Sequence, residues 1–225
     1  MKNPKIPEAT VVRLSIYSRY LTRLEQQGVP TVSSGEIAQA VGVSAAQVRK
    51  DLAYFGEFGT RGVGYGVKTL NAQILKILGL STPWSVVVVG VGNLGSALAS
   101  YRGFARRGFL IRALFDRDPA KVGRILNGLP VYGLERLPEV VRQVGASIGV
   151  ICVPADQAQP VADLLVAAGI RGILNFAPQY ISVPEPVLVR NVDLSVHLEV
   201  LSFGLVRRAE GERPGLAAAG NRPEE

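Results

Sequence analysis

Apolar residues are spaced differently in the first 80 residues than in the rest of the chain. At the front they recur every three or four positions, which is typical of amphipathic helices. Farther on, short apolar runs alternate with helical stretches, and this alternation predicts a parallel sheet with helices on both faces. We therefore expect an α/β protein, with a helical domain over residues 1–80 and a Rossmann-like domain over residues 84–193.

Two amphipathic patterns frame the N-terminal domain. Residues 7–27 repeat an apolar side chain every four positions until Gly28 ends the run. Residues 69–79 form the second pattern, which we interpret as a connecting helix. The proline-containing segment 81–83 then marks the boundary between the domains.

Between these patterns lie two capping signatures. Ser33 stands three residues before Glu36, and Ser44 stands three residues before Gln47. In both, the serine hydroxyl can accept a hydrogen bond in the first turn of a helix. Together they predict a helix-turn-helix. The two short helices are expected at residues 34–41 and 45–55.

The second of these helices has one face that suits DNA. Its other face carries Val48, Leu52 and Phe55, which should point into the core. Small side chains permit close approach to a groove, glutamine can read a base edge, and arginine and lysine can reach phosphates or guanine. An ordinary solvated helix face is the alternative. The residues expected to contact DNA are Ser44, Ala46, Gln47, Arg49, Lys50 and Tyr54.

The glycine-rich segment 57–67 predicts a short β hairpin. It lacks the Gly-Lys-Ser/Thr ending of a nucleotide-binding P-loop. A hairpin that directly follows a recognition helix is typical of a winged helix. Arg61 on this wing would reach the DNA backbone or the minor groove.

Residues 84–95 are the strongest motif of the second domain. Four valines run into a Gly-x-Gly-x-x-Gly triplet, which predicts a buried strand, a tight turn and a helix. Gly90 lets the chain turn, Gly92 lets the backbone approach a pyrophosphate, and Gly95 lets the helix pack closely on the strand. The free N–H groups of the helix start would face the phosphates. A glycine turn without a ligand is the alternative.

A second apolar strand, residues 109–115, ends at Asp116. A carboxylate in this place can accept hydrogen bonds from the adenine ribose hydroxyls. Arg117 directly follows and could meet a 2′-phosphate, but the carboxylate favours NAD over NADP. The further strands are expected at 131–132, 147–153, 172–176 and 187–192, and the further helices at 118–122, 138–144 and 156–168.

The last helix, expected at residues 194–208, is apolar on too many sides to lie singly on a surface. We expect it to pack against another subunit as well as its own domain. From residue 209 the composition turns to Gly, Pro, Glu and Ala, which indicates a disordered tail.

Charge is concentrated at the front of the chain. The net charge is +7; residues 1–68 carry nine Lys or Arg against five acids, a net of +4, and the longer remainder carries a net of +3. This distribution favours a polyanionic partner. The sequence contains no run of about 18 uncharged apolar residues, so no membrane-spanning helix is expected. The start lacks a signal-peptide pattern, and the single cysteine, Cys152, suits a reducing cytoplasm, as a core residue or as a redox-responsive thiol.

Residues for an enzyme reaction are hard to find in this sequence. Hydride transfer to a carbonyl needs a positioned acid or base, yet the one histidine, His197, lies in the apolar last helix, and no Tyr-x-x-x-Lys pair occurs. One histidine and one cysteine argue against a metal site. We therefore expect a non-enzyme. An NAD-dependent oxidoreductase acting on a small carbonyl, or a CoA- or nucleotide-binding module of a larger enzyme, are the alternatives.

Four motifs resemble the Rex family of bacterial redox-sensing transcriptional repressors, and the likeness runs from about Ile6 to Arg207. The resemblance implies a homodimer that binds a palindromic operator in double-stranded DNA when NAD⁺ predominates and releases it when NADH binds. It also implies a C-terminal helix exchanged between subunits. The motifs are residues 47–52, 58–65, 90–95 and 173–178.

The resemblance also assigns residues to the cofactor. A redox-linked relay is implied at Arg19, Tyr101 and Asp193. The residues expected to bind NADH and NAD⁺ are Gly90, Val91, Gly92, Asn93, Leu94, Gly95, Asp116, Tyr101 and Phe176.

Overall fold

The structure is a computed structural model that describes residues 6–59 and 63–211. Its chain divides into two compact units. One comprises Met1–Trp84 with Arg106–Phe109, and the other comprises Ser85–Ala105 with Leu110–Glu225. No helix in the described ranges is long and apolar enough to cross a bilayer.

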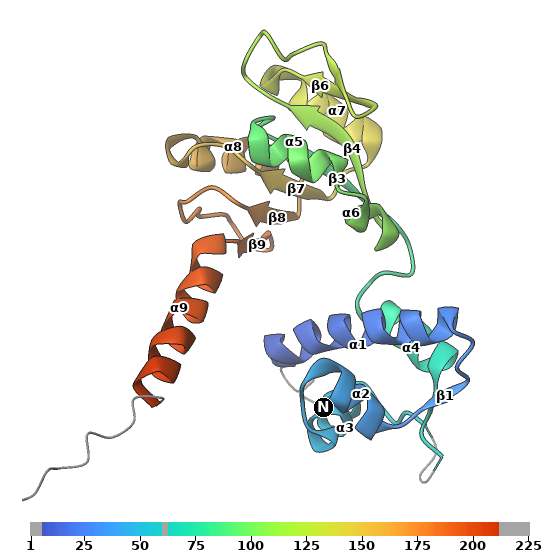
Figure 1. The fold of residues 1–225 in the computed structure, drawn as a ribbon. Helices are drawn as coiled ribbons and strands as arrows, with labels where there is room; N and C mark the ends of the chain where they lie inside the picture. The colour runs from blue at the N-terminus through green and yellow to red at the C-terminus, as the bar shows by residue number, and fades with distance from the viewer. Residues whose placement is uncertain (1–5, 60–62, 212–225) are drawn as a thin grey trace, which may run out of the picture. The chain divides into compact units, whose positions relative to one another are not determined.

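The N-terminal unit is built from four helices and a two-stranded sheet (Figure 1). Helix α1 packs along α4, while α2 and α3 form the expected helix-turn-helix. Gly42, which ends α2, adopts a left-handed conformation with φ 76° that glycine reaches without strain. The elements are α1 (Glu8–Gln26), β1 (Thr31–Val32), α2 (Ser34–Val41), α3 (Ala45–Ala53), β2 (Tyr65–Gly66) and α4 (Val67–Ile77).

Apolar faces of the four helices meet in one core. Leu14, Tyr17 and Leu21 of α1 are fully buried against Val48 of α3 and Ile74 of α4. This is the packing that the four-residue spacing predicts. Phe55 lies just beyond the end of α3 and packs partly buried against the same core.

The described part of the glycine-rich segment 57–67 contributes strand β2, and its partner lies far away in the sequence. Thr31 pairs with Gly66 and Val32 with Tyr65 in antiparallel register. The sequence analysis does not predict β1, because two residues after a proline carry no periodic signal. Arg61, expected on the wing, lies outside the described residues.

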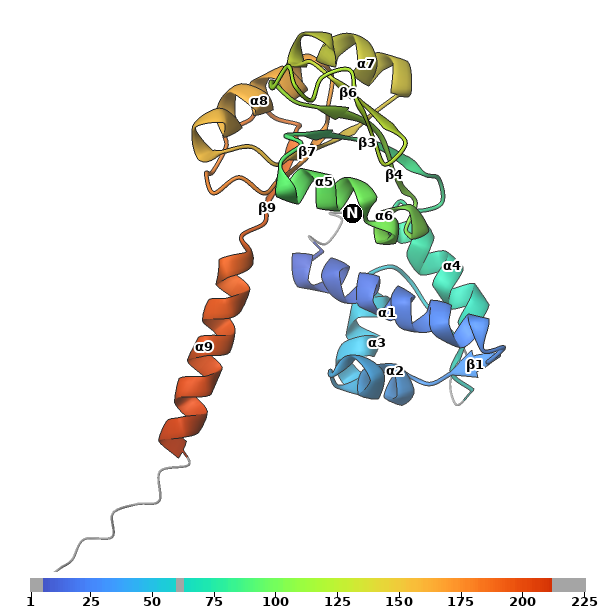
Figure 2. The ribbon, with the colours of Figure 1, turned by 45° about the horizontal axis from the view of Figure 1, so that its top comes forward.

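The second unit is a seven-stranded sheet with the strand order β5-β6-β4-β3-β7-β8-β9. The pairs β4–β6, β3–β7, β7–β8 and β8–β9 are parallel, as strand and helix alternation predicts. Figure 2 shows α5 on one face of the sheet and α7 and α8 on the other. The strands are β3 (Trp84–Val89), β4 (Phe109–Phe115), β5 (Ile125–Leu126), β6 (Leu129–Tyr132), β7 (Ile148–Ile151), β8 (Gly172–Asn175) and β9 (Leu188–Asn191); the helices are α5 (Asn93–Ser100), α6 (Arg102–Arg106), α7 (Leu137–Val144), α8 (Ala155–Ala167) and α9 (Leu194–Gly211), with a 3-10 turn at Leu134–Arg136.

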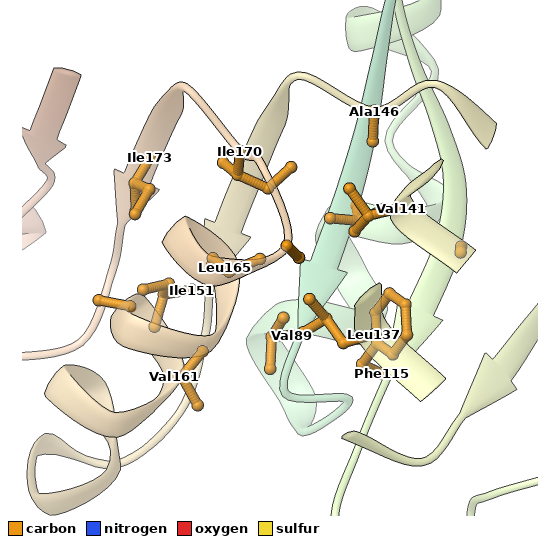
Figure 3. Packing of buried hydrophobic residues seen from close by; sticks show 14 of the residues in the cluster. Val89, Phe115, Leu137, Val141, Ala146, Ile151, Val161, Leu165, Ile170 and Ile173 are labelled. Carbon is orange, nitrogen blue, oxygen red and sulfur yellow. The ribbon is translucent and has the colours of Figure 1, made fainter. Parts of the chain in front are cut away.

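The main core lies between the sheet and the pair α7 and α8. Figure 3 shows Val89 and Phe115 of the sheet against Leu137 and Val141 of α7, with Leu165 of α8 beside them. Val86 and Val88 are also buried, and by strand alternation they face the opposite side. The four valines are therefore covered on both faces, which explains why they read as one continuous apolar run.

One local prediction in this unit is wrong. The helix expected at 118–122 is a single turn, because Lys121 and Val122 both donate to the Asp118 carbonyl and Gly123 then adopts φ 82°. The antiparallel strand β5 is missed, although the Asn127–Gly128 pair before β6, with φ 53° and 79°, is a known hairpin signal.

Candidate cofactor site and nucleic-acid interface

The glycine turn between β3 and α5 has the tight geometry that its sequence predicts. Gly90 adopts φ 96° and donates its N–H to the Phe115 carbonyl at 2.8 Å. A Cβ at Gly90 would overlap the Cys152 carbonyl, and a Cβ at Gly95 would overlap the carbonyl oxygen of Gly90. Both positions therefore require glycine for the packing of turn, helix and sheet.

Gly92 differs from its two neighbours in the motif. It is the N-cap residue of α5, and a Cβ built on it would meet no heavy atom within 4 Å. The first intrahelical bond runs from the Ser96 N–H to the Gly92 carbonyl, at 2.9 Å. The preceding N–H groups of the first turn thus have no helical acceptor and can face an anion.

The Asp116 carboxylate lies at the carboxyl end of β4 beside this turn. Its Oδ2 accepts from the Val91 N–H at 2.7 Å and from Lys121 Nζ at 3.2 Å, and its Oδ1 accepts from the Asp118 N–H at 2.9 Å. Burial raises the pKa of Asp116, but the backbone N–H groups and the Lys121 ammonium outweigh it, so the pKa is lowered overall. An ionised carboxylate has about four acceptor positions, and these three bonds leave room for a ribose hydroxyl.

Lys121 is absent from the predicted site. It stands five residues after Asp116, in the turn that replaces the expected helix. Because the sequence pattern predicts a helix there, it does not indicate the contact between Lys121 and Asp116. The ammonium also lies 3.9 Å from the Asp118 carboxylate.

A cavity of about 610 Å³ lies at this edge of the sheet, within the size range of ligand pockets. Of the predicted cofactor residues it takes in Gly90, Gly92 and Asp116. The lining also includes Arg117, Asp118, Pro119, Lys121, Leu134, Cys152, Val153, Pro154, Gln157, Val89 and Val161. Open space at a helix N-terminus, with a carboxylate at the neighbouring strand end, fits a dinucleotide.

Cys152 lies in the wall of this cavity with its thiol largely desolvated. Burial raises the pKa of Cys152 to about 12. The thiolate, which is the reactive form, is therefore scarce at neutral pH. This environment favours the structural interpretation of the residue.

The other predicted cofactor and relay residues do not line this cavity. Tyr101 is exposed, with its ring packed edge-on against Phe104, and Phe176 is half-buried after β8. Asp193 accepts from the N–H and hydroxyl of Ser195 at 2.9 and 2.7 Å at the start of α9. Arg19 is exposed on α1, in the other unit. Val91 and Gly95 are buried in the turn and helix, whereas Asn93 and Leu94 are exposed on α5.

Helix α3 presents the predicted DNA-contacting residues on its accessible face. Ser44, Ala46, Arg49 and Lys50 are exposed, while Gln47 and Tyr54 are half-buried. Arg49 Nη1 donates to the Ser34 hydroxyl at 3.0 Å, which ties α3 to α2. Lys50 makes no hydrogen bond or ion pair with the residues that the structure describes, so its ammonium is available to a phosphate.

The two capping signatures have different outcomes. The box at Ser33 and Glu36 is complete, with both reciprocal hydrogen bonds. At Ser44 only half of it forms: the hydroxyl accepts from the Gln47 N–H at 3.1 Å, but the Gln47 side chain turns to Asp51. A hydrogen bond to an ionised carboxylate is stronger than one between neutral groups, such as the bond that the Gln47 side-chain oxygen would accept from the Ser44 N–H, which explains the preference.

Asp51 is fully buried and was not among the predicted site residues. Its carboxylate joins α3 to α1 through Thr10, Arg13 and Tyr17. One signal was present in the sequence: position 51 falls three residues after Val48 on the apolar face of the helix. A carboxylate on a core-facing position requires a buried partner.

No cluster of three or more His, Cys, Asp or Glu residues in the described ranges could hold a metal ion. A second cavity, of about 560 Å³, lies beside the start of α9 and includes Tyr180, Arg190, Asp193 and His197. Its lining comes mainly from the segment after β8 and from the first turn of the last helix.

Two family models match the chain. One, described as "Putative DNA-binding protein N-terminus", matches residues 5–53, and the other, described as "CoA binding domain", matches residues 81–179. A redox-sensing transcriptional repressor Rex from Desulfitobacterium hafniense is 59% identical over 93% of this chain and 100% of that protein. A repressor of the same name from Streptomyces coelicolor is 53% identical over 95% of this chain and 83% of that protein.

Solved structures give the same match. RSP, a Rex-family repressor, superposes with a TM-score of 0.84 at 37% identity, over 92% of this chain and 96% of that one. RSP in complex with β-NAD⁺ and operator DNA gives a TM-score of 0.84 over 93% of this chain and 99% of that one, again at 37% identity. RSP in complex with β-NADH gives 0.82 at 36% identity, over 92% and 97%.

Proposed function

Because the chain belongs to the Rex family of redox-sensing transcriptional repressors, we propose that it binds a palindromic operator in its cofactor-free or NAD⁺-bound form and releases the operator when NADH binds. The observation that carries the proposal is the match to RSP, whose complexes contain β-NAD⁺ with operator DNA in one structure and β-NADH in another.

The cavity beside the glycine turn supports the cofactor part of this proposal. The pyrophosphate would lie at the N-terminus of α5, where Gly92 leaves open space, and the adenine ribose would lie at Asp116. Asp116 already binds Lys121, whose ammonium could also neutralise a 2′-phosphate beside Arg117. The acidic ribose partner favours NAD over NADP. The further residues assigned to the cofactor are Val91, Asn93, Leu94, Gly95, Tyr101 and Phe176.

Helix α3 supports the DNA part. Its N-terminal end would enter the major groove, as recognition helices do, with exposed Arg49 and Lys50 close to phosphates or guanine. Ser44, Ala46, Gln47 and Tyr54 would complete the contacting surface, and Arg61, which lies outside the described residues, would contribute a further contact.

A second copy of the chain would cover α9. Eight large apolar side chains of this helix are each 49–68% exposed. An apolar patch of this extent is typical of an interaction surface. A palindromic operator requires a protein with two-fold symmetry, and exchange of α9 between the two subunits would bury these side chains.

The redox signal would pass through the angle between the subunits. NADH and NAD⁺ differ by one positive charge and by the planarity of the nicotinamide ring, so only groups near that ring distinguish them. A relay of Arg19, Tyr101 and Asp193 would connect the ring to α1. Moving a mostly bound population to a mostly free one requires a differential affinity of about 5 kcal/mol, which two cofactor sites can share. Two recognition helices must match half-sites about one helical turn apart, so a rotation misplaces one.

The protein would act without catalysis, in the cytoplasm with the chromosome. The lining of the 610 Å³ cavity, taken over the described residues, includes no histidine or tyrosine that could serve as the acid or base of hydride transfer. The named relatives are transcriptional repressors, although the Rossmann-like fold is common among dehydrogenases.

One gel-shift titration tests the proposal. A palindromic duplex library is offered to the protein alone, with NAD⁺ and with NADH; only NADH should release the retained duplexes. Asp116→Ala should weaken the response to NADH while DNA binding without cofactor persists. Equal release by NAD⁺ and NADH would contradict the sensor, and turnover of a small carbonyl without selective DNA retention would favour an oxidoreductase.

A further inference from the structure

The buried carboxylate of Asp51 collects hydrogen bonds from two helices. From α1, Thr10 donates its hydroxyl to Oδ1 at 3.0 Å, Tyr17 donates its hydroxyl to Oδ2 at 2.7 Å, and Arg13 donates to both oxygens at 2.7 and 2.6 Å. From α3 itself, Gln47 donates its side-chain Nε2 to Oδ1 at 2.9 Å. Asp51 and Tyr17 are both 0% exposed.

This cluster determines which way the Gln47 amide faces. Burial raises the pKa of Asp51, but the hydrogen bonds from Arg13, Tyr17, Gln47 and Thr10 lower it to about 2. The carboxylate is therefore ionised at neutral pH and can only accept hydrogen bonds. Rotating the amide by half a turn would set its oxygen against a carboxylate oxygen, which is repulsive. Nε2 must face Asp51, and the amide orientation follows.

Gln47 stands where a recognition helix reads bases. It is the third residue of α3, and the N-terminal residues of such helices contact base edges. Gln47 is half-buried, so part of the residue remains accessible. An amide that presents its oxygen and one N–H in a constant order can bond adenine N6 and N7 together.

We propose that Asp51 is a positioning residue for base recognition: through its hydrogen bond it holds the Gln47 amide in one orientation and so sets a preference for adenine at one base pair of each half-site. This inference rests on the proposed function of the chain as an operator-binding repressor. A carboxylate that only joined α1 to α3 would stabilise the fold without affecting base preference.

The test compares base preferences rather than affinities. Duplexes are first selected from a randomised palindromic library with the wild-type protein, and every single-base variant of the selected site is then measured with wild type, Gln47→Ala and Asp51→Asn. The wild-type protein should prefer adenine about tenfold or more at one position of the site. Both variants should lose this preference. The double variant should show no further loss at that position.

Tyr17→Phe is the matched control. It removes a donor from Oδ2 of the same carboxylate and leaves the Gln47 contact at Oδ1 in place. Its preference profile should equal that of the wild type even where its thermal stability is lower. If Asp51→Asn weakens binding to all duplexes equally and keeps the profile, the inference is overturned.

If the Asp51→Asn variant does not fold, a measurement on the wild-type protein still tests the inference. In the ¹⁵N NMR spectrum, the side-chain amide of Gln47 should exchange with solvent at least tenfold more slowly than that of exposed Gln27. Equal exchange rates overturn the inference. A wild-type protein that selects no duplex overturns the proposed function, whereas selection with an unchanged Asp51→Asn profile overturns this inference alone.

Discussion

Replacing Gly92 by alanine tests the cofactor site with little disturbance of the fold. The new Cβ would meet no heavy atom within 4 Å, and φ −82° with ψ −165° is accessible to alanine. Alanine caps a helix less well than glycine, by up to about 1 kcal/mol, while the less flexible unfolded chain stabilises the fold by about 0.4–1 kcal/mol. The two effects oppose each other. We expect the free energy of unfolding to change by less than about 1 kcal/mol.

The effect on the cofactor should be much larger. The methyl group would add bulk at the residue where the backbone is expected to approach the pyrophosphate. Overpacking by one methyl group costs about 1–3 kcal/mol, which corresponds to a roughly 5- to 150-fold loss of affinity. Isothermal titration with NADH measures this loss, and thermal unfolding followed by circular dichroism measures stability.

Gly95→Ala is the matched substitution with the opposite expectation. A Cβ there would overlap the carbonyl oxygen of Gly90 and lie 3.0 Å from its carbonyl carbon and 3.4 Å from Cys152 Cβ. The turn and the helix must separate, so the variant should lose about 1–3 kcal/mol of stability or more. A folded Gly92→Ala protein with wild-type affinity for NADH would refute the placement of the pyrophosphate. A Gly95→Ala protein as stable as the wild type would refute the packing argument.

Three further predictions follow from the charges and burial of single residues. Lys50→Ala should lower the slope of log affinity for DNA against log salt concentration by about 1 for each Lys50 in the complex; an unchanged slope would exclude a phosphate contact. Because burial raises the pKa of Cys152 to about 12, a disulfide reagent at pH 8 should label the folded protein at least about a hundredfold more slowly than the unfolded chain, and equal rates would contradict this. The pKa of Asp51 is lowered to about 2 from 3.8, so its ionised form stabilises the fold by about 2 kcal/mol above pH 4, and this stabilisation disappears as the pH falls toward 2. Urea unfolding of wild type and Asp51→Asn should therefore differ less at pH 2 than at pH 5, and a constant difference would count against the linkage.

The elements that periodicity predicts well are those whose packing is decided by their own residues. The valine strand before Gly90, the helices around Ser33 and Ser44, and the alternation that follows all fall within a few residues of the observed bounds. In each case the signal is local: an apolar face, a cap or a glycine with one steric requirement.

The failures concern pairs of residues that are distant in sequence or compete for one group. Strand β1 exists because Thr31 and Val32 meet residues 65–66, more than 30 positions away. The predicted second capping box fails because the Gln47 amide donates to the ionised Asp51 carboxylate, a stronger hydrogen bond than the one it would accept from the neutral Ser44 N–H.

The sequence by itself determined the two-part architecture, the glycine turn and the helix-turn-helix. These features depend on the spacing of apolar residues, on helix capping and on positions where only glycine fits, which are properties of short stretches of sequence. Only the tertiary structure decided that Lys121 holds Asp116 beside the cavity and that Arg13 and Tyr17 of α1 hold Asp51 of α3. A buried charge takes its partners from whichever element folds against it, and no local pattern contains that choice.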